Sequence, residues 1–210
     1  TKNNYVNRNT TIHTSGKQPA IYALNTAGIQ ALKAAPNIDT ISLRKLYREH
    51  ERSTSFIQRC LLIADINLDL RERTSKLIDY GMYVPSDYAA LPLSHELTKL
   101  APHAVIVRQK SKQTDPSFIE VISELPDKHL RTQLNRYILP FDTGEWKAET
   151  HLSFPALLLV ATTPEVAKTT QRLIKQLTNK LEGSKPKILI TTSDKVTKHG
   201  ITGDIWQPLS

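Results

Sequence analysis

The residues of this chain best placed to do chemistry are Glu120 and His103. Glu120 lies in the middle of an apolar strand predicted over residues 117–122, and His103 opens another strand predicted over residues 103–109. A carboxylate supplies the oxygen ligand that Mg²⁺ prefers, whereas a neutral imidazole adds no charge and a protonated one repels a cation. If the two side chains shared one site, they would bind Mg²⁺ weakly, with the softer Mn²⁺ or Zn²⁺ as alternatives.

The elements that must position these two residues alternate between strand and helix from residue 102 onward. The continuous apolar run of residues 155–162 is typical of a central strand buried on both faces. Pro164 is well placed to open a helix that Gly183 ends. The predicted elements are strands 103–109, 117–122, 155–162 and 187–192, with a turn at 112–116, and helices 126–139 and 164–181. This order predicts an α/β fold in which helices cover the faces of one mixed sheet.

The stretch from Pro102-His-Ala-Val105 through Phe118-Ile-Glu-Val121 to the following amphipathic helix resembles the core of the PD-(D/E)XK nucleases. The resemblance implies an acid where His103 stands and a lysine where Ile122 stands, and with Glu120 these would hold a metal over a phosphodiester. This chain lacks both residues, so we expect a retained scaffold with a degenerate site. Glu120 and His103 are then the candidate catalytic positions, no metal ligands are assigned, and alanine at 120 should cost only modest stability.

The N-terminal part of the chain is strongly basic. Lys and Arg outnumber Asp and Glu by nine to three over residues 1–60, within a total of 28 to 20 for the whole chain. Concentrated positive charge is typical of phosphate binding, although an ordinary solvated surface remains the alternative. The candidate DNA-binding residues are Arg8, His13, Lys17, Arg44, Lys45, Arg48 and Arg52.

These basic residues are distributed over three predicted elements. Residues 3–24 predict a β-hairpin, and Ala27 to Ala34 predict a short helix that Asn25 or Thr26 caps. Residues 39–70 are expected to be helical, with an inward stripe at helical spacing formed by Phe56, Ile57, Cys60, Leu61 and Ala64. The apolar residues of the stretch 71–101 do not recur with a clean helical or strand period, so this stretch predicts short strands and loops. A basic hairpin followed by a helix is similar to the wing of a winged-helix domain, with an ordinary surface hairpin as the alternative.

Several short motifs together resemble the replication-relaxation family of plasmids and mobile elements. They include Tyr22-Ala-Leu-Asn-Thr-Ala-Gly-Ile-Gln-Ala-Leu32, the helical segment from His50 to Asp69, Phe154-Pro-Ala-Leu-Leu-Leu-Val160 and Trp206-Gln-Pro-Leu209. The resemblance implies three segments. Residues 1–38 would be the wing and helix of a truncated winged-helix domain, 39–101 a helical connector and the start of the core, and 102–210 a restriction-endonuclease-like core.

Some members of that family are similar to relaxases of the C class, which use a metal to nick DNA at the transfer origin. The chain departs from it, because Pro-His-Ala replaces Pro-Asp-Ala and Glu120-Val-Ile122 replaces Glu-x-Asp. The expected function is therefore a non-catalytic DNA-binding protein of a plasmid or mobile element, acting in replication or conjugative mobilization. The alternative is an active nickase that uses Glu120, with Glu49, Glu51 or Glu124 supplying further oxygens and Mg²⁺ or Mn²⁺ as its cofactor. A structural partner without nucleic-acid contact is a third possibility.

Composition and short motifs exclude several further classes of protein. The lone Cys60 excludes a disulfide framework or a cysteine zinc site. No run of 18 apolar residues exists, so the sequence predicts no membrane-spanning helix. The sequence contains neither a Gly-x-Ser-x-Gly motif nor a phosphate-binding Gly-x-x-x-x-Gly-Lys loop. The expected partners are double-stranded DNA and other relaxosome or replication proteins rather than a membrane, and the expected location is the cytoplasm.

Overall fold

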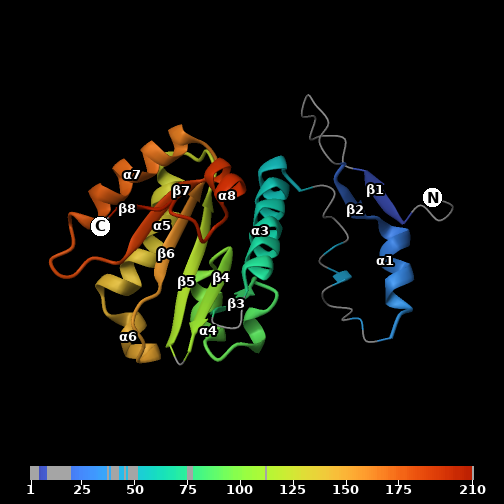
Figure 1. Cartoon of the computed structure of the whole chain (residues 1–210), viewed down its shortest axis with the longest axis horizontal. Coiled ribbons are helices and arrows are strands. Elements are labelled where there is room, and N and C mark those ends of the chain that lie inside the picture. The colour runs from blue at the N-terminus through green and yellow to red at the C-terminus, as the bar shows by residue number, and fades with distance from the viewer. Residues whose placement is uncertain are drawn as a thin grey trace. The chain divides into compact units, whose positions relative to one another are not determined.

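The computed structural model describes residues 5–8, 20–36, 38, 43–44, 46, 52–74, 78–111 and 113–209. The chain divides into two compact units, Thr1–Cys60 and Leu61–Ser210 (Figure 1). These differ from the three segments expected from the sequence. Residues 61–101 belong to the larger unit, because a strand and a helix from this stretch complete its sheet and core.

The first unit contains the predicted hairpin and short helix. Strand β1 (Val6–Arg8) pairs antiparallel with β2 (Tyr22–Leu24), with Asn7 opposite Ala23. Helix α1 (Thr26–Lys33) follows at once, and the Asn25 side chain caps it by accepting a 2.9 Å hydrogen bond from the Gly28 N–H. The hairpin tip lies outside the described residues.

Gly28 explains why α1 can lie so close to the preceding chain. A Cβ atom at this position would collide with the backbone carbonyl oxygen of Tyr5. Replacing Gly28 with alanine should therefore loosen the first unit and speed proteolytic cleavage within residues 1–60 at least several-fold, because backbone must move. Gly183→Ala is the matched control, since nothing lies within 4 Å of a Cβ there. Equal cleavage rates for the two variants would contradict the close packing.

The second unit is built on a six-stranded mixed sheet in the order β3-β4-β5-β6-β7-β8. The first three strands form an antiparallel meander, β5, β6 and β7 are parallel, and β8 returns antiparallel. The strands are β3 (Ile78–Tyr83), β4 (Ala104–Lys110), β5 (Gln113–Ile122), β6 (Ala156–Ala161), β7 (Ile188–Thr192) and β8 (Gln207–Pro208). All four predicted strands share this sheet, and β6 lies inside it between β5 and β7, as its apolar run predicts.

Helices cover both faces of the sheet (Figure 1). One apolar core lies between the sheet and α4, α5, α6 and α7, and a second lies between the sheet, α8 and the part of α3 after residue 60. Strand β5 serves both cores, because Phe118 and Ile122 face the first while Ile119 and Val121 face the second. The helices are α3 (Thr54–Arg73), α4 (Ser94–Leu100), α5 (Asp127–Asp142), α6 (Glu145–Thr150), α7 (Pro164–Thr178) and α8 (Ser193–His199).

The expectation of helix throughout residues 39–70 is wrong. Arg52 and Ser53 are not helical, and Ser53 instead caps α3, since its side-chain oxygen accepts a 3.3 Å hydrogen bond from the Phe56 N–H. The inward stripe is also wrong, because Ile63, Ile66 and Leu70 are buried while Cys60, Leu61 and Ala64 are exposed. Both sets have helical spacing, so periodicity alone could not choose between them.

Other features also differ from the sequence-based expectation: α7 ends at Thr178 with Asn179 as its cap, before Gly183. Residues 113–116, expected in a turn, extend β5, and Pro116 is tolerated because β5 pairs with β6 only from Ser117 onward. Helices α4, α6 and α8 were not predicted, since each has six or seven residues and therefore at most two turns of pattern. In α4, Leu97 and Leu100 are buried and pack in the first core, whereas the other residues of the helix are exposed or half-buried.

Candidate functional site

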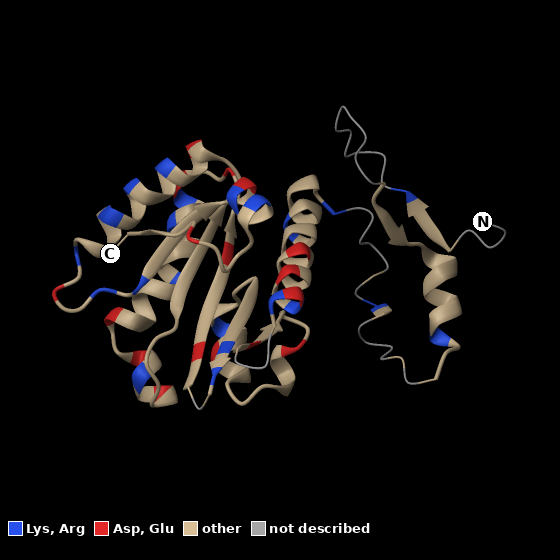
Figure 2. Ribbon diagram, in the orientation of Figure 1, with Lys and Arg blue, Asp and Glu red and all other residues tan. Residues whose placement is uncertain are grey.

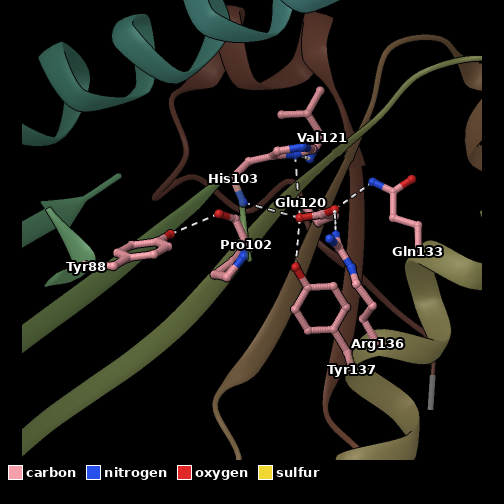
Figure 3. A network of polar contacts seen from close by, with 8 residues as sticks. All are labelled: Tyr88, Pro102, His103, Glu120, Val121, Gln133, Arg136 and Tyr137. Carbon is pink, nitrogen blue, oxygen red and sulfur yellow. Dashed lines mark hydrogen bonds and ion pairs between the residues drawn. The ribbon is translucent and has the colours of Figure 1, made fainter. Parts of the chain in front are cut away.

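His103 and Glu120 lie side by side, as the resemblance to the nuclease core implies. Ala104 of β4 is opposite Ile119 of β5, which places the start of one strand beside the acid of the other. The His103 N–H donates to the Ile119 carbonyl oxygen at 3.0 Å and to Glu120 Oε2 at 3.3 Å (Figure 3). His103, which follows Pro102 at the start of β4, therefore contacts the acid of the neighbouring strand, Glu120 of β5.

The Glu120 carboxylate is completely buried, and protein donors hold both of its oxygens. Oε1 accepts hydrogen bonds from Gln133 Nε2 at 2.6 Å and from an Arg136 guanidinium nitrogen at 2.9 Å. Oε2 accepts one from the Tyr137 hydroxyl at 2.8 Å and the longer one from the His103 N–H. Four donors match the roughly four lone-pair positions of a carboxylate, so this group is satisfied without a metal ion.

Helix α5 supplies three of the four donors. Gln133, Arg136 and Tyr137 are spaced i, i+3 and i+4, so they share the face of the helix that lies against β5 (Figure 3). Leu130 and Leu134 of the same helix are buried in the first core and fix its position. The polar contacts therefore join strand β5 to helix α5 within an otherwise apolar layer.

Burial dominates the electrostatics of this cluster. Removal from water raises the pKa of the Glu120 carboxyl, and the hydrogen bond from Gln133 and the charge of Arg136 oppose that shift. Burial and the neighbouring Glu120 raise the pKa of the Tyr137 hydroxyl well above its usual value, so it keeps its proton and acts as a donor. Both raised pKa values weaken Glu120 as a metal ligand. A metal needs the ionised carboxylate, which the raised pKa of Glu120 disfavours, and an open lone pair, which the protonated Tyr137 hydroxyl occupies.

The tautomer of His103 follows from its hydrogen bonds. Its Nδ1 accepts the Val121 N–H at 3.0 Å, so Nδ1 carries no proton and the ring is the neutral form with hydrogen on Nε2. The contact of 3.5 Å between Nδ1 and Glu120 Oε2 is then no ion pair. His103 thus links β4 to β5 through hydrogen bonds of its backbone and its ring. Tyr88 fixes the preceding residue, because its hydroxyl donates to the Pro102 carbonyl oxygen at 2.9 Å.

Ile122 stands where the nuclease pattern would have a lysine. It is fully buried in the first core, on the same face of β5 as Glu120. Among the described residues no group of three or more His, Cys, Asp and Glu side chains converges as a metal site would require. Glu124, one of the acids considered for the nickase, instead lines a cavity of about 490 Å³ beside Thr163 and Glu165. Glu49 and Glu51 lie outside the described residues.

The candidate DNA-binding residues are described only in part. Arg8 ends β1 and is exposed, as is Arg44. The Arg52 and Arg59 guanidinium groups each lie 5.0 Å from the centre of the Phe56 ring, a cation–π distance. His13, Lys17, Lys45 and Arg48 lie outside the described residues, so the expectation for them remains a prediction.

The sequence pattern alone did not identify Gln133, Arg136 and Tyr137 as partners of Glu120, although all three bind it. The signal that could have found the network is Gln133-x-x-Arg136-Tyr137 on the helix that follows an acid in a buried strand. On the same helix, Arg131 binds Gln176 of α7 at 2.9 Å, and His129 is exposed.

Comparisons with known proteins identify no relative: no protein-family model, no curated protein and no solved structure matches this chain. None of the described helices is both long enough and apolar enough to cross a membrane.

Proposed function

We propose that this chain is a DNA-binding protein of a plasmid or mobile element, acting in replication or conjugative mobilization, whose nuclease-like unit does not cleave DNA. The observation that carries the non-catalytic part is the Glu120 carboxylate, buried and bound by four donors of the protein itself. The basic composition of residues 1–60 supports the DNA-binding part.

The resemblance to the replication-relaxation family agrees with this proposal at two places. The β1–β2 hairpin followed directly by α1 is the arrangement that a wing and its next helix would have. The mixed sheet with helices on both faces, and His103 beside Glu120, is the arrangement that a nuclease-like core would have. In this proposal the Arg136 guanidinium supplies the positive charge at Glu120 that a metal supplies in an active nuclease.

A supercoiled plasmid provides the test, because binding and nicking can be scored on the same sample. With Mg²⁺ or Mn²⁺ the protein should retard the plasmid but leave it supercoiled, and Glu120→Gln should behave like the wild type in both respects. An unrelated Mg²⁺-dependent nickase is the positive control for cleavage. Nicking that requires the metal and disappears in Glu120→Gln would overturn the proposal and favour the nickase.

A further inference from the structure

Helix α7 has two chemically distinct faces. Its buried side packs on the sheet with Ala167, Thr170, Leu173, Ile174 and Thr178. The opposite side carries Lys168, Arg172 and Lys175, all exposed, at the i, i+4, i+7 spacing that places side chains on one stripe. We refer to these three residues as the basic face of α7.

Among the described residues, no ion pair neutralises the charge of the basic face. No Asp or Glu occurs from residue 166 to residue 181, where four Lys and Arg occur. In the part of the chain that the structure describes, ion pairs form at Asp69, Glu120, Glu145 and Glu149, and none includes a residue of the basic face. Figure 2 shows the contrast, because after the acidic Glu165 in its first turn α7 carries positive bands only, whereas both signs occur along α3.

A neighbouring helix adds to this charge. Arg131 of α5 lies against the exposed side of α7, since its guanidinium donates to Gln176 Oε1 at 2.9 Å. The side-chain amide of Gln176 is neutral, so Arg131 keeps its full charge there. Four cations from two packed helices therefore share one region of the surface.

We propose that the basic face of α7 binds the phosphate backbone of duplex DNA. The inference rests on the proposed DNA-binding function and adds a contact surface in the unit of residues 61–210, separate from the basic N-terminal third. With a rise of about 1.5 Å per residue, the three cations are about 6 and 4.5 Å apart along the helix. Phosphates of one DNA strand succeed one another every ~3.4 Å along the axis, so flexible Lys and Arg side chains can each reach one.

The composition of the face favours a phosphate backbone over a membrane surface or the centre of a protein interface. The large apolar side chains that are exposed among the described residues lie on other elements, such as Leu68 of α3 and Leu139 of α5. A membrane-surface helix needs apolar side chains to insert, and the centre of a protein interface needs aromatic or apolar anchors. Gln171, Gln176 and Asn179 beside the stripe are instead the uncharged polar side chains that commonly hydrogen-bond to phosphate and sugar.

The test compares two triple variants of the full chain that lose the same charge. One carries K168Q, R172Q and K175Q. The control carries R71Q, K110Q and K147Q, which alter exposed residues of α3, β4 and α6. Glutamine is a good helix former, and circular dichroism checks that both variants fold. Affinity for a fluorescent duplex is measured by anisotropy across a series of salt concentrations.

We expect the α7 variant to bind at least ~10-fold more weakly at 100 mM salt. The slope of log affinity against log salt should fall by about 2–3, as the loss of three phosphate contacts requires. The control should change affinity less than ~3-fold. Equal losses in both variants would show that only net charge matters and would overturn the inference while leaving DNA binding intact. Failure of the wild type to bind any duplex would instead refute the proposed function, and this inference with it.

Discussion

Replacing Glu120 with alanine should lower the free energy of unfolding of the residue 61–210 unit by about 3–5 kcal/mol. The substitution removes the buried acceptor of four hydrogen bonds between β5 and its neighbours. The Tyr137 hydroxyl, on a side chain that is 1% exposed, would lose its partner, and so would the Arg136 charge. Because of the buried network, the expected loss of stability in Glu120→Ala is larger than the modest loss that the sequence alone predicts.

Urea unfolding followed by tryptophan fluorescence measures this change, because Trp146 and Trp206 both belong to the larger unit. Glu124→Ala is the matched control: its side chain is exposed, so its effect should stay within about 0.5 kcal/mol. Arg136→Met should cost less than Glu120→Ala, since the Arg136 side chain is 36% exposed and water can replace part of its role. A loss below about 1 kcal/mol for Glu120→Ala would contradict a structural role for the network.

The same network shows what the sequence could predict. The pairing of β4 with β5 was predictable, because consecutive short strands joined by a turn pair antiparallel, whereas the placement of His103 beside Glu120 was expected only from the resemblance to the nuclease core. The central position of β6 was predictable from its unbroken apolar run, and the start of α7 from Pro164, which follows the Thr163 cap. These signals are local, or depend only on the order of neighbouring elements.

The partners of Glu120 were harder to predict because they depend on how a helix packs on a strand. Arg136 lies among Leu134, Tyr137 and Ile138 in the sequence, and nothing local shows that its guanidinium turns toward β5 rather than toward solvent. The buried side of α3 was missed for a similar reason, since two apolar stripes compete and only the sheet decides between them. Tertiary packing supplied the information that periodicity lacked.

DNA affinity should depend steeply on salt concentration. If the basic residues of the N-terminal third and of α7 together neutralise about six phosphates, affinity should fall by roughly 10³ between 50 and 200 mM salt, because each contact releases condensed counterions. Arg8→Ala with Lys17→Ala should weaken binding further at every salt concentration. Arg71→Ala with Lys147→Ala removes the same charge from α3 and α6 and serves as the control.

The measurement that tests the central claim most directly is the affinity of the full chain for duplex DNA over this salt range, with and without Mg²⁺. Our account predicts a steep linear fall of log affinity with log salt, with Mg²⁺ acting only as a competing counterion and never increasing affinity. Absence of binding at 50 mM salt, or an affinity that does not change with salt, would contradict DNA binding. Tighter binding with Mg²⁺ that is lost in Glu120→Gln would contradict a satisfied, metal-free carboxylate.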